Sequence, residues 1–253
     1  LTVISILEGF GAIIRDVRVP ELKSLLVEPI DGTALAHLDR GLFEAHARDE
    51  AGYKDQGGHK QMWEAARDLA LENPKVPSDV FLRLMGDRGQ SRGGDPLFPQ
   101  IDKTLYRMIS MMAQVFVIEV FARETFDWGV SLLSDPEVSA EPVRASNMVA
   151  YIRSDEAPHV EYLRAALSET RARTLRTIDG KTIAGQTVVD GIVHHILTRV
   201  GENRPREQRD ETRGAVLAAI EAGSANKSLL EAFDALAPSW QPPAHTGFES
   251  AAA

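Results

Sequence analysis

The segment Asp155-Glu156-Ala157-Pro158-His159 follows a near copy of itself, Asp49-Glu50-Ala51-Gly52-Tyr53, which lies 106 residues earlier in the chain. Each copy comes after an apolar run that contains a single glutamate, Glu8 in the first half and Glu119 in the second. This lone glutamate precedes the glutamate of its Asp-Glu segment by 42 residues in the first half and by 37 in the second. Because both halves repeat the same order of acidic residues at similar spacing, they indicate one site to which both contribute.

Apolar residues recur at helical spacing along most of the chain, and the alternation typical of strands is almost missing. The class that we expect is all-α. The periodicity and the breaks at Pro and Gly predict helices at about 2–17, 21–28, 33–50, 59–73, 78–86, 101–133, 141–173, 183–200, 205–222 and 226–236. Glycine and proline concentrate in 86–100, which predicts a loop, and residues 177–182 predict a tight turn.

The long helices fall into two similar pairs within about 1–173, and the loop at 86–100 would join the pairs as a long crossover. This layout predicts a four-helix bundle. The helices at about 183–236 would pack outside the bundle, and the tail 238–253, rich in Pro, Ala, Gly and Ser, would be irregular. A chain of 253 residues can bury its core as one domain, so we expect a single domain over 1–253.

The repeated acidic residues are candidates for a dinuclear metal site, which in a bundle takes carboxylates from several helices and usually one imidazole for each metal. Glu156 and His159 share one helix face, because residues at i and i+3 are neighbours. Glu8 and Glu119 lie among Val, Ile, Leu and Phe, where an unpaired carboxylate costs several kcal/mol. The predicted ligands are Glu8, Glu50, Glu119, Glu156 and His159. Such oxygen and imidazole donors suit iron and manganese.

Asp49 and Asp155, beside the two glutamates, are expected to support the ligands rather than to bind the metal themselves. A ligating histidine usually donates its second ring nitrogen to a carboxylate, which fixes its tautomer. We therefore expect Asp49 to face His159 across the bundle, with an ordinary surface position as the alternative for each aspartate. Pro158 removes a backbone donor from the turn that carries His159, which predicts a local kink or bulge.

Tyr53 stands where the repeat predicts a second histidine, and three outcomes are open. The phenol could bind a metal or lie beside it as a catalytic residue. A different histidine could replace it: His46 lies about 40° from Glu50 around a helix, whereas His59 lies roughly 180° away. Only a break at Gly57-Gly58 would bring His59 to the site. The third outcome is a site that holds one metal or none.

These residues resemble the ligand pattern of the ferritin-like di-iron carboxylate superfamily over about 1–173. The resemblance rests on Glu8, Glu50, Glu119, Glu156 and His159. It implies a ferritin-like bundle that holds two iron ions, with manganese or a mixed Mn/Fe pair as variants, and that activates O2 as an oxygenase or oxidase. His46 is similar to an extra histidine in some N-oxygenating members.

An enzyme of this kind would act on a small organic substrate, which we expect to be apolar or aromatic. It would need an external electron donor, and so a reductase partner, because the chain has no flavin or iron–sulfur motif. The alternative is a non-catalytic metal-binding or partner subunit in which the second metal position is degraded.

Composition narrows the class of protein. The net charge of −9 disfavours a surface that binds nucleic acid. We expect no membrane span, because no run of about 18 apolar residues stands out. The absence of cysteine and of a recognisable secretion signal predicts a cytoplasmic protein. Paired bundles commonly dimerise, so a homodimer is also an expectation.

Overall fold

The computed structural model describes residues 1–76, 95–199, 204–223 and 225–235. Within these residues the chain is mostly helical, and its strands form one two-stranded hairpin. The predicted all-α class is therefore confirmed. The predicted helix at 78–86, most of the predicted loop at 86–100 and the tail 238–253 lie outside the described residues.

The first half contains α1 (Thr2–Gly11), η1 (Ala12–Asp16), α2 (Leu22–Leu25), η2 (Ala34–Arg40), α3 (Leu42–Ala51) and α4 (His59–Ala70), where η marks a short 3-10 helix. The second half contains α6 (Lys103–Leu133), α7 (Pro142–Arg171), β1 (Thr174–Arg176), β2 (Thr182–Ala184), α8 (Gly185–Thr198), α9 (Arg204–Glu221) and α10 (Lys227–Ala235). The chain packs as two compact units, Leu1–Val193 and His194–Ala253. A single domain over 1–253 stays a prediction.

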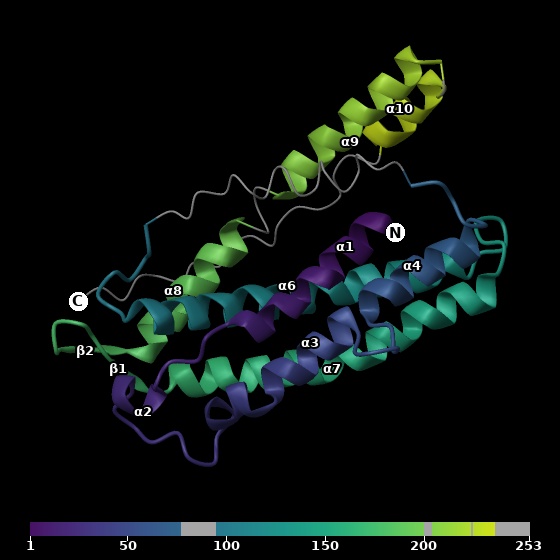
Figure 1. Cartoon of the computed structure of the whole chain (residues 1–253). Helices are drawn as coiled ribbons and strands as arrows, with labels where there is room; N and C mark the ends of the chain where they lie inside the picture. The colour runs from purple at the N-terminus through teal and green to yellow at the C-terminus, as the bar shows by residue number, and fades with distance from the viewer. Residues whose placement is uncertain (77–94, 200–203, 224, 236–253) are drawn as a thin grey trace. The chain divides into compact units, whose positions relative to one another are not determined.

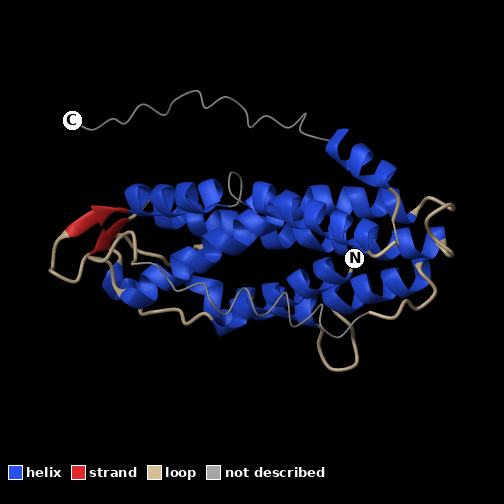
Figure 2. Ribbon diagram, turned by 90° about the horizontal axis from the view of Figure 1, so that it is seen from above, coloured by secondary structure: helices blue, strands red, loops and turns tan. Residues whose placement is uncertain are grey.

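In the first unit, α1, α4, α6 and α7 run side by side (Figure 1). The helices α6 and α7 pack along each other, and α4 packs against both α1 and α7. A hydrophobic core between α4, α6 and α7 contains Trp63, Ala66, Ala70, Phe126, Leu133, Ala145, Val149 and Ile152. The β1–β2 hairpin lies at one end of these helices (Figure 2), and it confirms the turn predicted at 177–182.

The N-termini of the two longest helices, α6 and α7, are stabilised by their first residues. Asp102 caps α6 by accepting hydrogen bonds from the backbone N–H groups of Thr104 and Leu105, at 2.9 and 3.0 Å. Proline starts α7, where its missing N–H costs nothing. The helix then continues through Pro158 as one α-helix, without the bulge that was one of the two expectations, and the kink stays a prediction. Pro158 lies on the exposed face, where water can bond the carbonyl that has lost its donor.

Two predicted helices are divided in the structure. The predicted helix at 2–17 is α-helical only to Gly11 and continues as η1. The predicted helix at 33–50 consists of η2 and α3, which meet at Gly41. This glycine has φ of +143°, a backbone conformation that other residues rarely adopt. The division turns α3 relative to η2, so the residues of α3 face directions that a continuous helix would not give them.

The helix α6 is the one described helix that is long and apolar enough, by length and composition, to cross a membrane. Its most apolar 18-residue window has a mean hydropathy of 1.5, and 44% of that window is buried inside the protein. One such helix is weak evidence for a span, because the core helix of a soluble protein passes the same test. A core role also suits the buried Glu119, which lies in the middle of this helix.

The second unit contains α9 and α10, which pack against each other. Arg213 on α9 makes two hydrogen bonds to Asp234 on α10, at 2.9 and 3.0 Å. The guanidinium of Arg209 lies 5.2 Å from the ring centre of Phe233. Both contacts join the two helices.

Candidate metal centre

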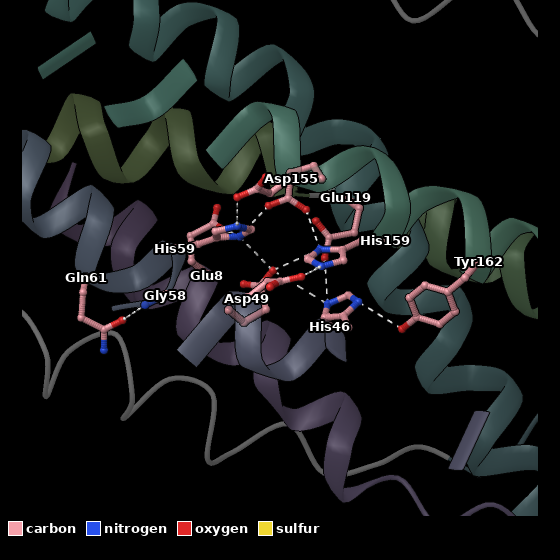
Figure 3. Close-up of polar contacts among 12 residues, drawn as sticks. Glu8, His46, Asp49, Gly58, His59, Gln61, Glu119, Asp155, His159 and Tyr162 are labelled. Carbon is pink, nitrogen blue, oxygen red and sulfur yellow. Dashed lines mark hydrogen bonds and ion pairs between the residues drawn. The ribbon is translucent and has the colours of Figure 1, made fainter. Parts of the chain in front are cut away.

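Buried acidic and histidine side chains from α1, α3, α4, α6 and α7 meet in the first unit and form two groups that could hold metal ions (Figure 3). The His46 group consists of His46, Glu50, Glu119 and His159, and the His59 group consists of Glu8, Glu50, His59 and Glu156. Within each group one possible ligand atom from every residue lies within 4.8 Å of the others. The structure thus brings together all five ligands predicted from the repeat, and it adds both alternative histidines.

Two carboxylates connect the groups. Glu50 belongs to both, and its Oε1 atom lies 3.3 Å from Nδ1 of His59 and 3.5 Å from Nδ1 of His159. Glu156 places Oε1 at 2.9 Å from Nδ1 of His59, and it places Oε2 at 2.9 Å from Nδ1 of His159. Each carboxylate therefore faces one imidazole of each group, which is the position that a bridging ligand of two metals requires.

The distances between these atoms suit a shared cation. Two ligand atoms at right angles around a metal, each about 2.1 Å from it, are about 3.0 Å apart. The separation of 2.9 Å between His59 and Glu156 falls at this value, and Nε2 of His46 lies 3.4 Å from Oε1 of Glu119. The rings of His46 and His159 are stacked, with centroids 3.9 Å apart and an angle of 17° between their planes. Both rings therefore approach the centre from neighbouring directions.

Several polar atoms at the centre lack a hydrogen bond although they are buried. These atoms are Nε2 of His46, Nε2 of His59 and Oε1 of Glu156. Glu156 Oε1 lies close to His59, but the two groups are not aligned as a hydrogen bond. Buried polar groups are normally paired, because leaving one unpaired costs about 1–3 kcal/mol. A metal would satisfy Glu156 Oε1 and His46 Nε2 directly.

The centre concentrates negative charge in a region away from water. Burial, together with the charges of neighbouring carboxylates, raises the pKa of Glu8 and of Glu119 well above its ordinary value. Burial and the neighbouring His159 lower the pKa of His46 to about 3, so this imidazole is neutral and has a lone pair for a metal. Divalent cations are the natural compensation for buried carboxylates that face one another.

His59 reaches the centre because the chain breaks between α3 and α4. Gly52 ends α3 with φ of +84°, and Gly58 precedes His59 at the start of α4. A Cβ atom on Gly58 would lie 2.3 Å from the backbone nitrogen of Gly52, so the two glycines close a tight loop. The loop folds the chain back and turns His59 towards Glu50. This is the break at 57–58 that the alternative with His59 required.

Gly11 leaves the space that the Glu50 carboxylate occupies. A Cβ atom on Gly11 would lie 2.7 Å from Cδ and 2.8 Å from Oε2 of Glu50. The backbone of Gly11 has negative φ, so alanine introduces no backbone strain there. Gly11→Ala therefore acts mainly on the position of the carboxylate.

We expect Gly11→Ala to weaken metal binding by about 10–100-fold, the usual effect of disturbing the surroundings of a ligand, with little change in the melting temperature of the metal-free protein. Competition with a coloured chelator measures the affinity. Gly9→Ala on the same helix is the control, because its Cβ would meet only the flexible Lys60 side chain, at 3.0 Å. Equal affinities for the two variants would show that the Glu50 carboxylate tolerates displacement.

Asp49 and Asp155 lie at the edge of the centre, half-exposed above two buried histidines. Asp49 Oδ2 is 3.1 Å from Nε2 of His159, which is the contact expected from the sequence. Asp155 Oδ2 is 3.9 Å from Nε2 of His59. The two side chains are 51% and 60% exposed, so this edge is the part of the centre that faces solvent. Asp49 is therefore placed to accept the ring proton of His159, whereas Asp155 faces His59 at a distance too long for a hydrogen bond.

The ring of Tyr53 packs against Arg48 and Lys54, and the phenol beside the metal stays a prediction. Tyr53 is 42% exposed and lies after the end of α3, where Gly52 turns the chain outward. Its ring packs under the guanidinium of Arg48, with 4.0 Å to the ring centre. Its predicted catalytic role receives no support from this position. Of the three outcomes open at Tyr53, the geometry matches the replacement of the missing imidazole by His46 and His59.

Tyr162 is a neighbour of the centre that the sequence reading missed. Its hydroxyl lies 3.0 Å from Nδ1 of His46 (Figure 3). Burial and the charges of Glu119 and Glu50 raise the pKa of this phenol, which is therefore uncharged at neutral pH. Spacing could have indicated it, because Tyr162 follows His159 by three residues and shares its helix face.

The buried charges predict how the stability of the metal-free protein depends on pH. Burial lowers the pKa of His59, but the carboxylates of Glu156 and Glu50 outweigh burial and raise it to about 10, from 6.5 in a free side chain. This contribution to folding is complete below pH 6.5 and is lost as the pH rises through about 10. The raised pKa values of Glu8 and Glu119 also make the folded state less stable as the pH rises, because the folded state holds their protons more tightly than the unfolded state does.

We therefore expect the melting temperature of the metal-free protein to fall steadily as the pH rises from 6.5 to about 10. Calorimetry in the presence of a chelator measures this dependence, and Glu119→Gln should flatten it. A melting temperature that rises over the same range would show that these groups are not buried against one another in solution.

A comparison of the chain with protein-family models, with curated proteins and with solved structures finds no match. Function must therefore be inferred from the side chains of the metal centre themselves.

Proposed function

We propose that this chain is a non-haem dinuclear metal enzyme, most simply a di-iron oxidase or oxygenase built on a ferritin-like bundle. The observation that carries the proposal is the pair of buried ligand groups that share Glu50. His46, His159 and Glu119 would hold one metal, and Glu8 and His59 would hold the other. Glu50 and Glu156 would bridge them. Manganese or a mixed Mn/Fe pair would suit the same donors.

The ligand set supports iron over softer metals. It offers carboxylate oxygens and imidazole nitrogens, and the chain has no cysteine. The three imidazoles serve two groups, because His59 supplies the nitrogen that Tyr53 does not. This speaks against the alternative of a non-catalytic subunit with a degraded second position. When bound, a reduced iron pair would supply electrons to dioxygen and would then oxidise a substrate.

The surrounding residues contribute orientation, exclusion of water and proton acceptance. Asp49 holds the ring of His159, and Asp155 faces that of His59. On the side of His46 the neighbours are aromatic, with the rings of Phe43 and Tyr162 in edge contact at 6.4 Å between centroids. This aromatic wall supports a small apolar or aromatic substrate. Electrons would come from an external donor such as a reductase, as inferred from the sequence.

Anaerobic loading with Fe(II) followed by exposure to air tests the proposal. We expect about two iron ions per chain, as two four-residue ligand groups require, and rapid uptake of dioxygen by the loaded protein. The Zn(II)-loaded protein is the matched control, because zinc fills the same ligands but has no redox chemistry. One iron or none per chain, or oxygen uptake no faster than that of free Fe(II), would refute the proposed function.

A further inference from the structure

Tyr162 contacts the centre through His46. It lies on α7 with its hydroxyl 3.0 Å from Nδ1 of His46, and its ring meets the imidazole edge-on at 89° with 5.8 Å between centroids. Figure 3 shows the phenol on the side of His46 that faces away from the carboxylates. The other nitrogen of His46, Nε2, is buried without a hydrogen bond and lies 3.4 Å from Glu119.

The position of one proton decides whether His46 can bind a metal. A neutral imidazole carries a proton on Nδ1 or on Nε2, and only the nitrogen without it has a lone pair. Nε2 is the atom that faces Glu119, so a metal there requires the proton on Nδ1. Nδ1 must then donate its hydrogen bond, and the oxygen of Tyr162 is the acceptor at hydrogen-bond distance.

A phenol suits this position because it is both a donor and an acceptor. With the proton on Nε2, the Tyr162 hydroxyl can donate to Nδ1. With the proton on Nδ1, the same oxygen accepts after the hydroxyl hydrogen rotates away, and no heavy atom has to move. The hydrogen bond therefore survives the change of tautomer that metal binding demands.

His159 shows the contrast. Its outer nitrogen faces the Asp49 carboxylate, which only accepts and is half-exposed to water. The Nδ1 side of the buried His46 meets Tyr162, which packs in turn against Phe43, and an ionised carboxylate there would be poorly solvated. A neutral acceptor is the alternative that adds no further negative charge to the centre.

We propose that Tyr162 is a positioning residue, which holds the His46 ring and accepts its Nδ1 proton so that Nε2 is free for a metal. This inference rests on the proposed function, because it assigns a partner to one of the proposed ligands. It concerns the affinity of the His46 group and leaves the His59 group unaffected.

The test compares Tyr162→Phe, which keeps the ring against Phe43 and removes only the oxygen, with Tyr151→Phe. Tyr151 is 67% exposed on the same helix and serves as the control. Anaerobic titration with Fe(II) against a chelator should show one site weakened by about 10–100-fold in Tyr162→Phe, the other site unchanged, and both unchanged in Tyr151→Phe. The metal-free Tyr162→Phe protein should melt only a few degrees below the wild type, because one hydrogen bond to His46 is lost in either tautomer.

A second readout follows the proton itself. Nitrogen NMR of the Zn(II)-loaded wild type should show His46 protonated at Nδ1 and protected from exchange with water, and Tyr162→Phe should lose this protection. Unchanged affinity and an unchanged His46 signal, in a wild type that binds two metals, would overturn the inference and leave the proposed function intact. Equal weakening of both metal sites in Tyr162→Phe would make the hydroxyl a general packing element and would also overturn it. A wild type that binds no metal would refute both.

Discussion

Glu50→Ala is expected to abolish the binding of both metals, whereas the loss of any ligand that serves a single group should spare one. Glu50 is the residue common to the two ligand groups, and its Oε1 atom lies within 3.5 Å of an imidazole nitrogen from each. Among the described neighbours, Glu156 already faces an imidazole of each group, and Glu8 and Glu119 belong to one group each, so none of them is free to take its place. The metal content of the isolated variant should therefore fall from about two per chain to about none.

Elemental analysis and thermal melting measure this effect together. Wild-type protein in metal at 100 times its dissociation constant should gain about 2.7 kcal/mol for each independent site, and Glu50→Ala should gain nothing. Glu44→Ala is the matched control, since Glu44 lies on the same helix and makes an exposed ion pair with Arg48 at 2.8 Å. Retention of one full equivalent of metal by Glu50→Ala would show that the two positions do not share this carboxylate.

Gly52→Ala should destabilise the fold strongly and move the side chain of His59 away from the centre. The added Cβ would lie 2.5 Å from the carbonyl oxygen of Gln56 and 2.8 Å from the backbone nitrogen of Gly58. Both are backbone atoms, so the loop itself must open. This clash and the positive φ of the residue both destabilise the variant. We expect the free energy of unfolding to fall by about 3–4 kcal/mol. The opening also turns the start of α4, so the metal of the His59 group should be lost.

Chemical denaturation and metal analysis check this expectation, and Gly32→Ala separates its two causes. Gly32 has φ of +75°, close to that of Gly52, but a Cβ there would meet nothing within 4 Å. Gly32→Ala should therefore cost only the backbone strain, about 1–2 kcal/mol, with full metal content. If the two variants were equally stable, the contact of the added Cβ atom with the backbone of Gln56 and Gly58 would not contribute to the loss of stability.

The sequence predicted the class of fold and most of the centre because both depend on local patterns. Helical periodicity indicated an all-α chain. The repeated acidic segment identified Glu8, Glu119 and the chelating pair on α7, and all of them meet in the structure. The contact between Asp49 and His159 followed from the chemistry of a ligating histidine rather than from spacing. Their roles as metal ligands stay predictions.

The role of Tyr53 stays a prediction without support, because the repeat was extended two residues beyond the end of α3. Counting three positions from Glu50 assumes a helix, and the helix ends at Ala51. Beyond it, the direction of a side chain depends on a loop whose closure is a contact between backbone atoms of Gly52 and Gly58. The periodicity of apolar residues in the sequence cannot predict such a contact between backbone atoms. The doublet at 57–58 showed that a break was possible, but it did not show which way His59 would turn.

Phe121 illustrates the same limit on a continuous helix. It lies in the same apolar run as Glu119, yet its side chain is 49% exposed. Glu119, two residues earlier, is buried, and residues two apart on a helix point about 200° from one another. The predicted ligand role of Glu119 therefore places Phe121 on the opposite face of the helix, and the sequence alone contains this constraint.

The half-exposed aspartates at the edge of the centre have a consequence for the rate at which ions arrive. A cation that approaches the protein meets Asp49 and Asp155 first, and the chain as a whole carries a net charge of −9. Such a field raises the encounter rate of divalent ions and decays within about 10 Å at 0.1 M salt. The rate of metal binding should therefore fall as the ionic strength of the buffer rises. The dissociation of ions that the buried ligands already hold should depend little on the ionic strength.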